Sequence, residues 1–207
     1  MPDSSGYHLI DSYMRRKLEQ IRETYDQGST KAVLANLRRG VGKRPDSQPR
    51  LWGMLLEGIP EELLGRGENI SYSEWAVYIS LTMYALHQQG LSISDQNMNT
   101  YDEKQNLGRS MAHLISSMDD EARIVRKFDI LVTSSDFEEL SYHLRTIIQL
   151  LRDKKVPLNY PLLAKDLFSF QFGEGAKNVG FKWGQSFYAE LNMMHEKDKD
   201  KKTQDQS

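Results

Sequence analysis

Residues 71–86 read SYSEWAVYISLTMYAL, and their apolar side chains recur at intervals of three and four. These intervals place side chains on one face of an α-helix. Ser71 and Glu74 precede the apolar run with the S-x-x-E spacing of a capping box, in which two side chains bind the first free backbone N–H groups. The stretch therefore predicts a helix that begins just after Ser71. The predicted inward residues are Trp75, Tyr78, Ile79, Thr82, Met83 and Leu86.

The same helical spacing continues outward in both directions. Ser135 and Glu138 predict a second capping box, for a helix that ends before Pro157. Asn159 with Pro161 predicts the start of another helix. Further helices are predicted near residues 8–26, 30–39, 105–116, 119–132 and 181–194. No stretch alternates with the period of two that is typical of strands, so the sequence predicts an all-α, compact bundle of roughly eight to nine helices without a sheet.

We expect these helices to form two lobes, an N-terminal lobe at residues 1–117 and a C-terminal bundle at residues 118–194. The tail at residues 195–207 is rich in charged side chains and nearly free of apolar ones. Such a segment cannot bury enough apolar surface to offset the entropy that ordering removes. We therefore expect the tail to be disordered.

The composition argues against several classes of function. The 207 residues include no cysteine, which excludes disulfides, thiolate metal sites and cysteine nucleophiles. The histidines are scattered without metal-ligand spacing, and acidic residues 119–121 follow Ser117 at a predicted helix start, where the helix dipole favours negative charge. No segment has the apolar length of a signal peptide or a membrane span. We expect a soluble, cytoplasmic protein with no membrane contact, cofactor, metal or catalytic site.

Charge is unevenly distributed, although the net charge is only -2. Residues 31–50 hold six basic side chains against one acidic side chain, a balance of +5, and residues 57–74 hold five acidic against one basic, a balance of -4. The basic segment includes LRRGVGKRP at residues 37–45, but it is not a phosphate loop. Arg44 stands where a hydroxyl would bind Mg²⁺, and Pro45 follows it. The asymmetry suggests one surface for an anion and another for a different partner.

Helical spacing gathers several basic side chains beside the apolar faces. Each of three predicted helices has such a face. They carry Arg123, Arg126 and Lys127; Arg145 and Arg152; and Lys31 and Arg38, respectively. If these helices lie side by side, their cations form a track suited to a phosphate backbone. The alternative is that they are solvated faces paired with nearby acidic residues, and spacing alone does not decide between the two.

A later cluster combines Lys177, Lys182 and Trp183 with phenylalanine and tyrosine residues between positions 168 and 188. Aromatic rings interleaved with cations can stack nucleic-acid bases. The rings also fit helix-packing intervals, so we interpret them as core residues. Only the two lysines are retained as candidate binding residues.

Five segments carry a resemblance to a known family. They are ALHQQG (85–90), LGRSMAHL (107–114), RKFDILVTSSDFEELSYHLRTIIQLL (126–151), LNYPLLAKDLFSF (158–170) and KWGQSFY (182–188). In this order and spacing they are similar to the CasB family, the small subunit of the type I-E CRISPR interference complex Cascade. The resemblance implies an all-α protein of antiviral defence, present as two copies beside other Cascade subunits. It also implies contact with the crRNA backbone and with the displaced non-target DNA strand, and a binding role rather than a nuclease activity.

The resemblance also implies which basic residues contact nucleic acid. On this sequence the matching positions are Arg38, Arg39, Arg109, Arg126, Lys127 and Arg145, with Lys177 and Lys182 in addition. Lys43 and Arg44 are candidates by charge alone, and Arg123 and Arg152 by helical spacing. We hypothesise a non-catalytic subunit whose cations bind the phosphates of crRNA and single-stranded DNA. The alternative hypothesis is a helical protein-interaction or scaffold module without a direct nucleic-acid role.

Overall fold

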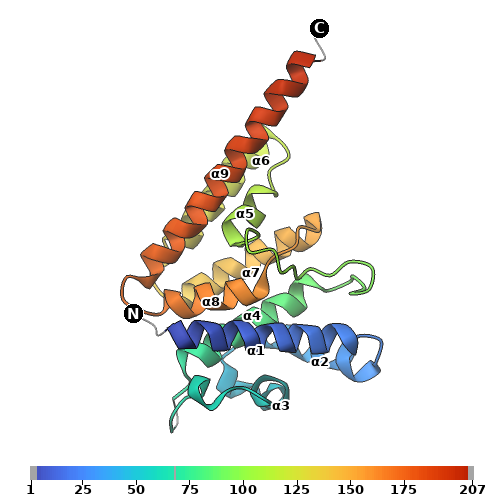
Figure 1. Cartoon of the computed structure of the whole chain (residues 1–207), viewed down its shortest axis with the longest axis vertical. Coiled ribbons are helices and arrows are strands. Elements are labelled where there is room, and N and C mark those ends of the chain that lie inside the picture. The colour runs from blue at the N-terminus through green and yellow to red at the C-terminus, as the bar shows by residue number, and fades with distance from the viewer. Residues whose placement is uncertain (1–3, 68, 205–207) are drawn as a thin grey trace.

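The computed structural model describes residues 4–67 and 69–204, which form nine α-helices (Figure 1). The helices are α1 (Ser4–Glu23), α2 (Gly28–Gly40), α3 (Pro49–Leu56), α4 (Tyr72–His87), α5 (Leu107–Ala112), α6 (Met118–Val132), α7 (Phe137–Lys154), α8 (Tyr160–Phe170) and α9 (Gly175–Gln204). Short 3-10 helices, η1 and η2, lie at Pro45–Ser47 and Glu61–Leu63. The described residues contain no β-strand, and a lone bridge pairs Asn99 with Leu158. The prediction of an all-α fold without a sheet is confirmed.

Helix α4 lies at the centre of the fold. Every residue from Ala76 to His87 is buried, because α1, α2, α7 and α8 all pack against this helix. The predicted capping box is present: the Ser71 hydroxyl accepts a hydrogen bond from the Glu74 N–H at 2.9 Å, and the Glu74 carboxylate accepts one from the Ser71 N–H at 2.7 Å. The predicted helix is confirmed, and its buried surface is wider than the single face that the spacing indicates.

A buried hydrogen bond fixes α2 against α4. The Tyr78 hydroxyl donates to the Gly40 carbonyl oxygen at 2.7 Å. A Cβ atom at Gly40 would lie 2.7 Å from the Tyr78 hydroxyl and 2.9 Å from Leu51 Cδ1. Any other residue here would have to displace the Tyr78 hydroxyl and the Leu51 side chain, so the glycine permits the approach that sets the position of the basic C-terminal end of α2.

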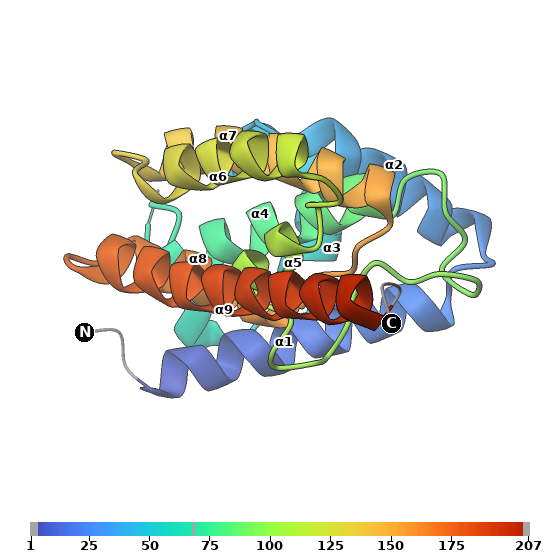
Figure 2. The same ribbon diagram turned by 90° about the horizontal axis from the view of Figure 1, so that it is seen from above.

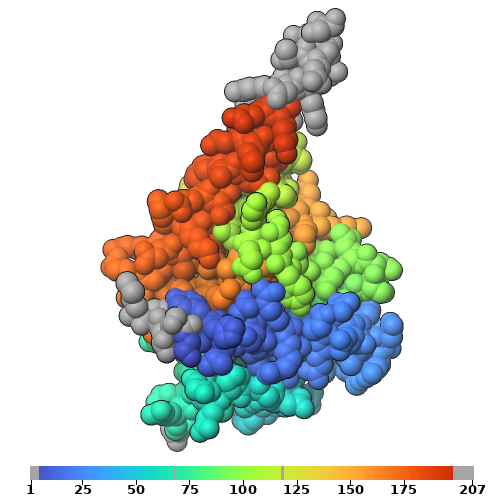
Figure 3. Space-filling view, viewed as in Figure 1, coloured from blue at the N-terminus to red at the C-terminus, as the bar shows by residue number. Residues whose placement is uncertain are grey.

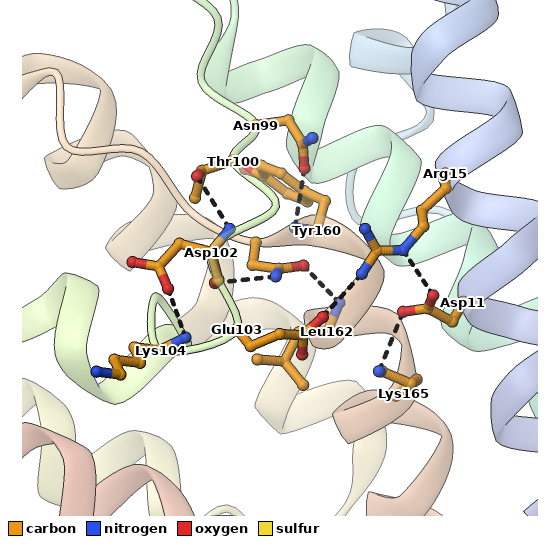
Figure 4. Close-up of polar contacts among 11 residues, drawn as sticks. Asp11, Arg15, Asn99, Thr100, Asp102, Glu103, Lys104, Tyr160, Leu162 and Lys165 are labelled. Atoms are coloured by element: carbon orange, nitrogen blue, oxygen red, sulfur yellow. Dashed lines mark hydrogen bonds and ion pairs between the residues drawn. The ribbon is translucent and has the colours of Figure 1, made fainter.

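The segment between α4 and α5 fastens α1 to α8 (Figure 4). The Asn159 amide oxygen caps α8 by accepting from the Leu162 N–H at 2.9 Å, and its amide nitrogen donates to the Asp102 carbonyl oxygen at 3.0 Å. On the other side, the Arg15 guanidinium bridges Asp11 at 2.6 Å and Glu103 at 2.8 Å. The adjacent loop residues Asp102 and Glu103 therefore link the start of α8 to α1.

The helices are arranged around α4 with a clear sidedness. Figure 2 shows α2, α6 and α7 along one side of the molecule and α1 along the opposite side. Helix α7 packs against α4 and α6, and the long α9 packs against α5, α6 and α8. One cluster of buried apolar side chains draws residues from α1 through α9. Helices on both sides of residue 117 share this cluster, so the division into lobes at 1–117 and 118–194 stays a prediction.

Several helix boundaries differ from the prediction. Helix α7 is capped by Asp136, which accepts from the Glu139 N–H at 2.8 Å, so the predicted capping box of Ser135 and Glu138 is wrong. Glu139 supplies the returning carboxylate, which accepts from the Ser135 N–H at 2.7 Å. The true pair lies one residue further along a run that offers a capping side chain at each of its positions.

Helices α3 and α9 show two further differences. Helix α3 begins at Pro49 and spans only 8 residues, too few for a clear periodic pattern. Helix α9 begins at Gly175, ahead of the predicted start at residue 181, and continues to Gln204. The tail contains no proline or glycine and is rich in lysine, which favours helix; the predicted disorder of residues 195–207 stays a prediction. Residues 205–207 lie outside the described residues.

We expect the substitution Asn159→Ala to lower the free energy of unfolding by about 1–3 kcal/mol, because it removes a buried cap and leaves two backbone groups without a partner. Urea denaturation measures this change. Asn192→Ala, at an exposed asparagine of α9, is the control and should change stability by less than about 0.5 kcal/mol. Equal effects of the two substitutions would contradict the proposed role of the cap.

A second prediction concerns His87, whose Nδ1 lies 2.9 Å from the buried Tyr160 hydroxyl. Burial lowers the pKa of His87 from 6.5 to about 4. Between these two pH values the imidazole is mostly protonated in the unfolded chain and mostly neutral in the folded chain. Stability is therefore retained above pH 6.5 and falls as the pH drops toward 4, by about 2 kcal/mol between pH 7 and pH 5. Urea denaturation at both pH values should show this loss shrinking in His87→Gln and unchanged in the control His8→Gln. An unchanged loss in His87→Gln would contradict the assignment.

Candidate nucleic-acid interface

Helix α2 and the turn after it carry the first group of predicted cations. Arg39, Lys43 and Arg50 line a surface pocket of ≈ 280 Å³ together with uncharged residues and no acidic side chain. The Arg39 guanidinium donates to the Asn36 amide oxygen at 3.0 Å. The hydrogen-bond donors of this pocket are thus free of carboxylates, as a site for an anion requires.

Arg38 lies on the other flank of α2. With Lys31 it lines a second pocket, formed against Tyr25 and the Gln88–Ser92 turn. Partial burial lowers the pKa of the Arg38 guanidinium, and no carboxylate of the described residues pairs with it. A partly desolvated cation of this kind gains more from an anionic ligand than a fully hydrated one does.

Helix α6 carries the second group. Ile124, Phe128 and Leu131 are buried, which confirms the predicted inward face. Arg126 is exposed and Lys127 is half-buried, and neither pairs with a carboxylate of the described residues. Their neighbour Arg123 differs, because it forms an ion pair with Asp120 at 2.6 Å.

Helix α7 carries the third group. Arg145 is exposed and has no carboxylate partner within residues 4–67 and 69–204. Arg152, two turns later, pairs with Asp153 at 3.1 Å and donates to the Gln89 amide oxygen at 3.4 Å. The last contact places Arg152 at the same turn that closes the Arg38 pocket.

The twelve predicted cations therefore divide into two sets. Six have no carboxylate partner in the described part of the chain, and we call them the cationic track: Arg38, Arg39, Lys43, Arg126, Lys127 and Arg145. The other six form ion pairs, namely Arg44–Asp46 (3.1 Å), Arg109–Glu190 (2.9 Å), Arg123–Asp120 (2.6 Å), Arg152–Asp153 (3.1 Å), Lys177–Glu174 (2.9 Å) and Lys182–Asp166 (2.8 Å). The three helices of the track lie on the same side of the molecule (Figure 2).

Two of the ion pairs bind a buried carboxylate. Asp166 is buried and accepts from Lys182 Nζ at 2.8 Å and from Trp183 Nε1 at 2.7 Å. Burial raises the pKa of Asp166, and the charge of Lys182 opposes that rise. Releasing Lys182 to a phosphate would leave a buried carboxylate short of a partner, which is costly. Lys182 therefore holds α9 on α8, and its predicted role in nucleic-acid binding stays a prediction.

Arg109 likewise pairs with a buried carboxylate, in its case between α5 and α9. Its guanidinium pairs with the buried Glu190, whose other oxygen lies 2.9 Å from His113 Nε2. Gly108 lies against the Trp183 backbone, where a Cβ atom would collide. This glycine brings α5 close enough to α9 for Arg109 to reach Glu190. The remaining four pairs are on exposed side chains, where an ion pair contributes only about 0–1 kcal/mol and exchanges readily.

The aromatic cluster is partly core and partly surface. Trp183, Phe187, Phe168 and Phe170 are buried, as predicted. Phe181 and Tyr188, in contrast, are 69% and 45% exposed on α9, so the interpretation of these two rings as core is wrong. Their positions fit helical intervals but lie on the outer face, which spacing alone does not distinguish.

Sequence reasoning left two neighbouring cations out of the predicted set. The structure places Lys31 beside Arg38 and Arg50 beside Arg39 and Lys43. The signal for Lys31 was the seven-residue interval to Arg38, and the signal for Arg50 was the local excess of charge. Among the described residues, no group of three metal-binding side chains converges, and no helix has the length and apolar character to cross a membrane.

Both the sequence and the fold of this chain are similar to those of known proteins. A family model described as CRISPR-associated protein Cse2 matches residues 33–188. The fold is similar to CasB from Thermobifida fusca, with 30% sequence identity and a TM-score of 0.71 over 86% of this chain and 97% of that chain. No match is found among curated protein sequences.

Two further solved structures share the fold at lower identity. One is a chain of a CRISPR RNA-guided surveillance complex, at 19% identity and a TM-score of 0.70, covering 91% of this chain and 98% of that chain. The other is a CRISPR-associated protein of the Cse2 family from Thermus thermophilus, at 19% identity and a TM-score of 0.63, covering 85% of this chain and 97% of that chain. At this identity, the two matches show likeness of fold alone.

The geometry predicts that two arginines of the predicted set contribute very differently to stability. Arg109→Ala should lower the free energy of unfolding by about 1–3 kcal/mol, because Glu190 stays buried without its cation. Arg145→Ala is the matched control and should change stability by less than about 0.5 kcal/mol. Chemical denaturation of both variants measures the difference. A neutral Arg109→Ala would show that its ion pair with Glu190 is not structural.

Proposed function

The chain belongs to the CRISPR-associated Cse2 family, whose model matches residues 33–188, and from this premise we propose that it is a non-catalytic, nucleic-acid-binding subunit of a CRISPR RNA-guided surveillance complex. The resemblance to CasB found in the sequence is confirmed by this match and by the fold. In the proposed role the chain contacts the backbone of the crRNA and stabilises the displaced non-target strand of DNA, as part of antiviral defence in the cytoplasm.

The observation that carries the proposal is the cationic track. Its six side chains keep their charge available, since no carboxylate of the described residues pairs with them. They come from α2, the turn after it, α6 and α7, and these three helices lie on one side of the molecule (Figure 2). Arginine suits this role because its planar, forked donors match phosphate oxygens. Contacts of this kind hold a strand without reading its bases.

The physical effect of such contacts follows from the energetics of strand exchange. The RNA–DNA heteroduplex is about as stable as the DNA duplex that it replaces, so small contributions from protein contacts to the backbone decide the balance. A displaced strand bound along the cationic track is less available to its complement. The track would therefore favour the open state without any catalytic step.

The low net charge of the chain is also consistent with a subunit that binds nucleic acid as part of an assembly. A net charge of -2 gives little long-range attraction for a free polyanion, so binding depends on local cations and on neighbours that raise the effective concentration. The partners in this proposal are the crRNA, single-stranded DNA, the other subunits of the complex and a second copy of this chain. If four to six phosphates are neutralised, the logarithm of the affinity for single strands should fall with the logarithm of salt concentration at a slope of about -3 to -4.

We expect a triple variant, Arg126→Ala, Lys127→Ala and Arg145→Ala, to bind single-stranded DNA and crRNA about tenfold or more weakly and to reduce the salt slope by about 2. Electrophoretic mobility shifts with the full chain at several salt concentrations measure both quantities. The control removes three exposed cations outside the track, with Arg66→Ala, Lys104→Ala and Lys197→Ala, and changes net charge equally.

The control should retain most of the affinity. Equal losses in the two triple variants would mean that bulk charge rather than the track is responsible. Wild-type affinity in the first variant, both free and in the assembled complex, would favour the alternative of a scaffold module without a direct nucleic-acid role.

A further inference from the structure

An apolar cleft lies between α3 and the segment that leads into α4. Its walls include Trp52, Leu56, Ile59 and Ile70, and Leu55 and Val77 form part of its floor. The cleft has a volume of ≈ 260 Å³. Trp52 and Leu56 are 44% and 42% exposed, which is unusual for large apolar side chains that lie side by side on one short helix.

The walls of the cleft are held in place by hydrogen bonds. Trp52 Nε1 donates to the Pro45 carbonyl oxygen at 3.1 Å, which fixes the indole ring against η1. The Ser71 hydroxyl donates to the Leu63 carbonyl oxygen at 2.6 Å, and the Gly65 N–H donates to the Glu74 carboxylate at 3.0 Å. The capping box of α4 therefore also anchors the opposite wall, so the cleft exists before any ligand arrives.

Acidic side chains lie in the cleft and beside it. Asp46 and Glu74 are among its lining residues, which include no lysine or arginine. Glu61 and Glu62 are exposed in the segment between the lining residues Ile59 and Gly65, which we call the rim, and no cation in the described part of the chain pairs with either. Within residues 57–67 and 69–74 there are four glutamates and a single cation, Arg66. The rim would repel a phosphate backbone and attract a basic group.

Helix α3 separates this cleft from the cations of the track. Arg50 faces the pocket shared with Arg39 and Lys43, whereas Trp52 lines the apolar cleft. At 100° per residue the two side chains lie roughly 160° apart around the helix. The region that contains the cleft lies at the end of the molecule opposite to α9 (Figure 3). A ligand in the cleft and a nucleic acid on the track would therefore meet opposite faces of α3.

We propose that this cleft docks a polypeptide segment of a neighbouring subunit that inserts one large apolar side chain and flanks it with lysine or arginine. The size of the cleft suits one inserted side chain, because its ≈ 260 Å³ is less than the roughly 300–1,000 Å³ of pockets that enclose a whole drug-sized ligand. Its chemistry fits as well, since interface anchors are apolar side chains in preformed pockets with charged groups at the rim. The inference rests on the proposed function, which supplies the neighbouring subunit.

The test replaces Leu56 with the photo-crosslinking residue p-benzoylphenylalanine in the complete complex, assembled with its guide RNA. The proposal expects a cross-link to another protein subunit, at an apolar residue next to lysine or arginine, identified by mass spectrometry. A cross-link to nucleic acid or to a second copy of this chain would overturn it, and so would the absence of any cross-link.

A second arm uses Leu56→Glu, with Met193→Glu as the matched control, since Met193 is also 42% exposed and lies on α9. Leu56→Glu should enter the complex with about tenfold or more lower affinity, while Met193→Glu should enter as the wild type does. Circular dichroism and single-stranded DNA binding of the free variant should both remain at wild-type values. Wild-type incorporation of Leu56→Glu overturns the docking site, whereas failure of the wild-type chain to bind nucleic acid counts against the proposed function alone.

Discussion

The enclosure of α4 is the constraint on which the rest of the structure depends. A helix whose side chains are buried from Ala76 to His87 must be covered on all faces, and α1, α2, α7 and α8 do this. Two of these neighbours, α2 and α7, carry cations of the track, and α6 packs on α7. The hydrogen bond from Tyr78 to Gly40 fixes where α2 ends. Packing around one apolar helix therefore decides which of the helices that carry these cations share a side of the molecule (Figure 2).

The burial of the carboxylates sorts the basic residues by role. Glu190 and Asp166 are buried, so Arg109 and Lys182 are bound to partners whose desolvation makes them costly to leave. The exposed pairs of Arg44, Arg123, Arg152 and Lys177 lie in solvent, where such pairs contribute little. The cationic track has neither restraint within the described residues. The same residue type thus stabilises the fold at one position and remains available for a phosphate at another. Helix α3 separates the basic pocket from the apolar cleft, which has acidic side chains beside it.

Local signals in the sequence predicted most of the helices and their caps, because a capping box or an apolar interval depends on residues only a few positions apart. The cap of α7 was misplaced by one residue where neighbouring side chains offered equivalent acceptors. Helix α3 was missed because 8 residues carry little periodicity. The pairing of Arg109 with Glu190 and of Lys182 with Asp166 joins different helices, so intervals along one helix could not reveal it. The apolar cleft likewise depends on how η1, α3 and the following segment meet.

The central proposal is that the six cations of the track bind a nucleic-acid backbone. The most direct measurement is the structure of the assembled complex with guide RNA and target DNA, determined by electron cryo-microscopy. The account predicts that the side chains of Arg126, Lys127 and Arg145 lie within hydrogen-bond distance of phosphate oxygens of one strand. A structure in which these groups contact only protein or solvent, while both strands run elsewhere, would contradict it.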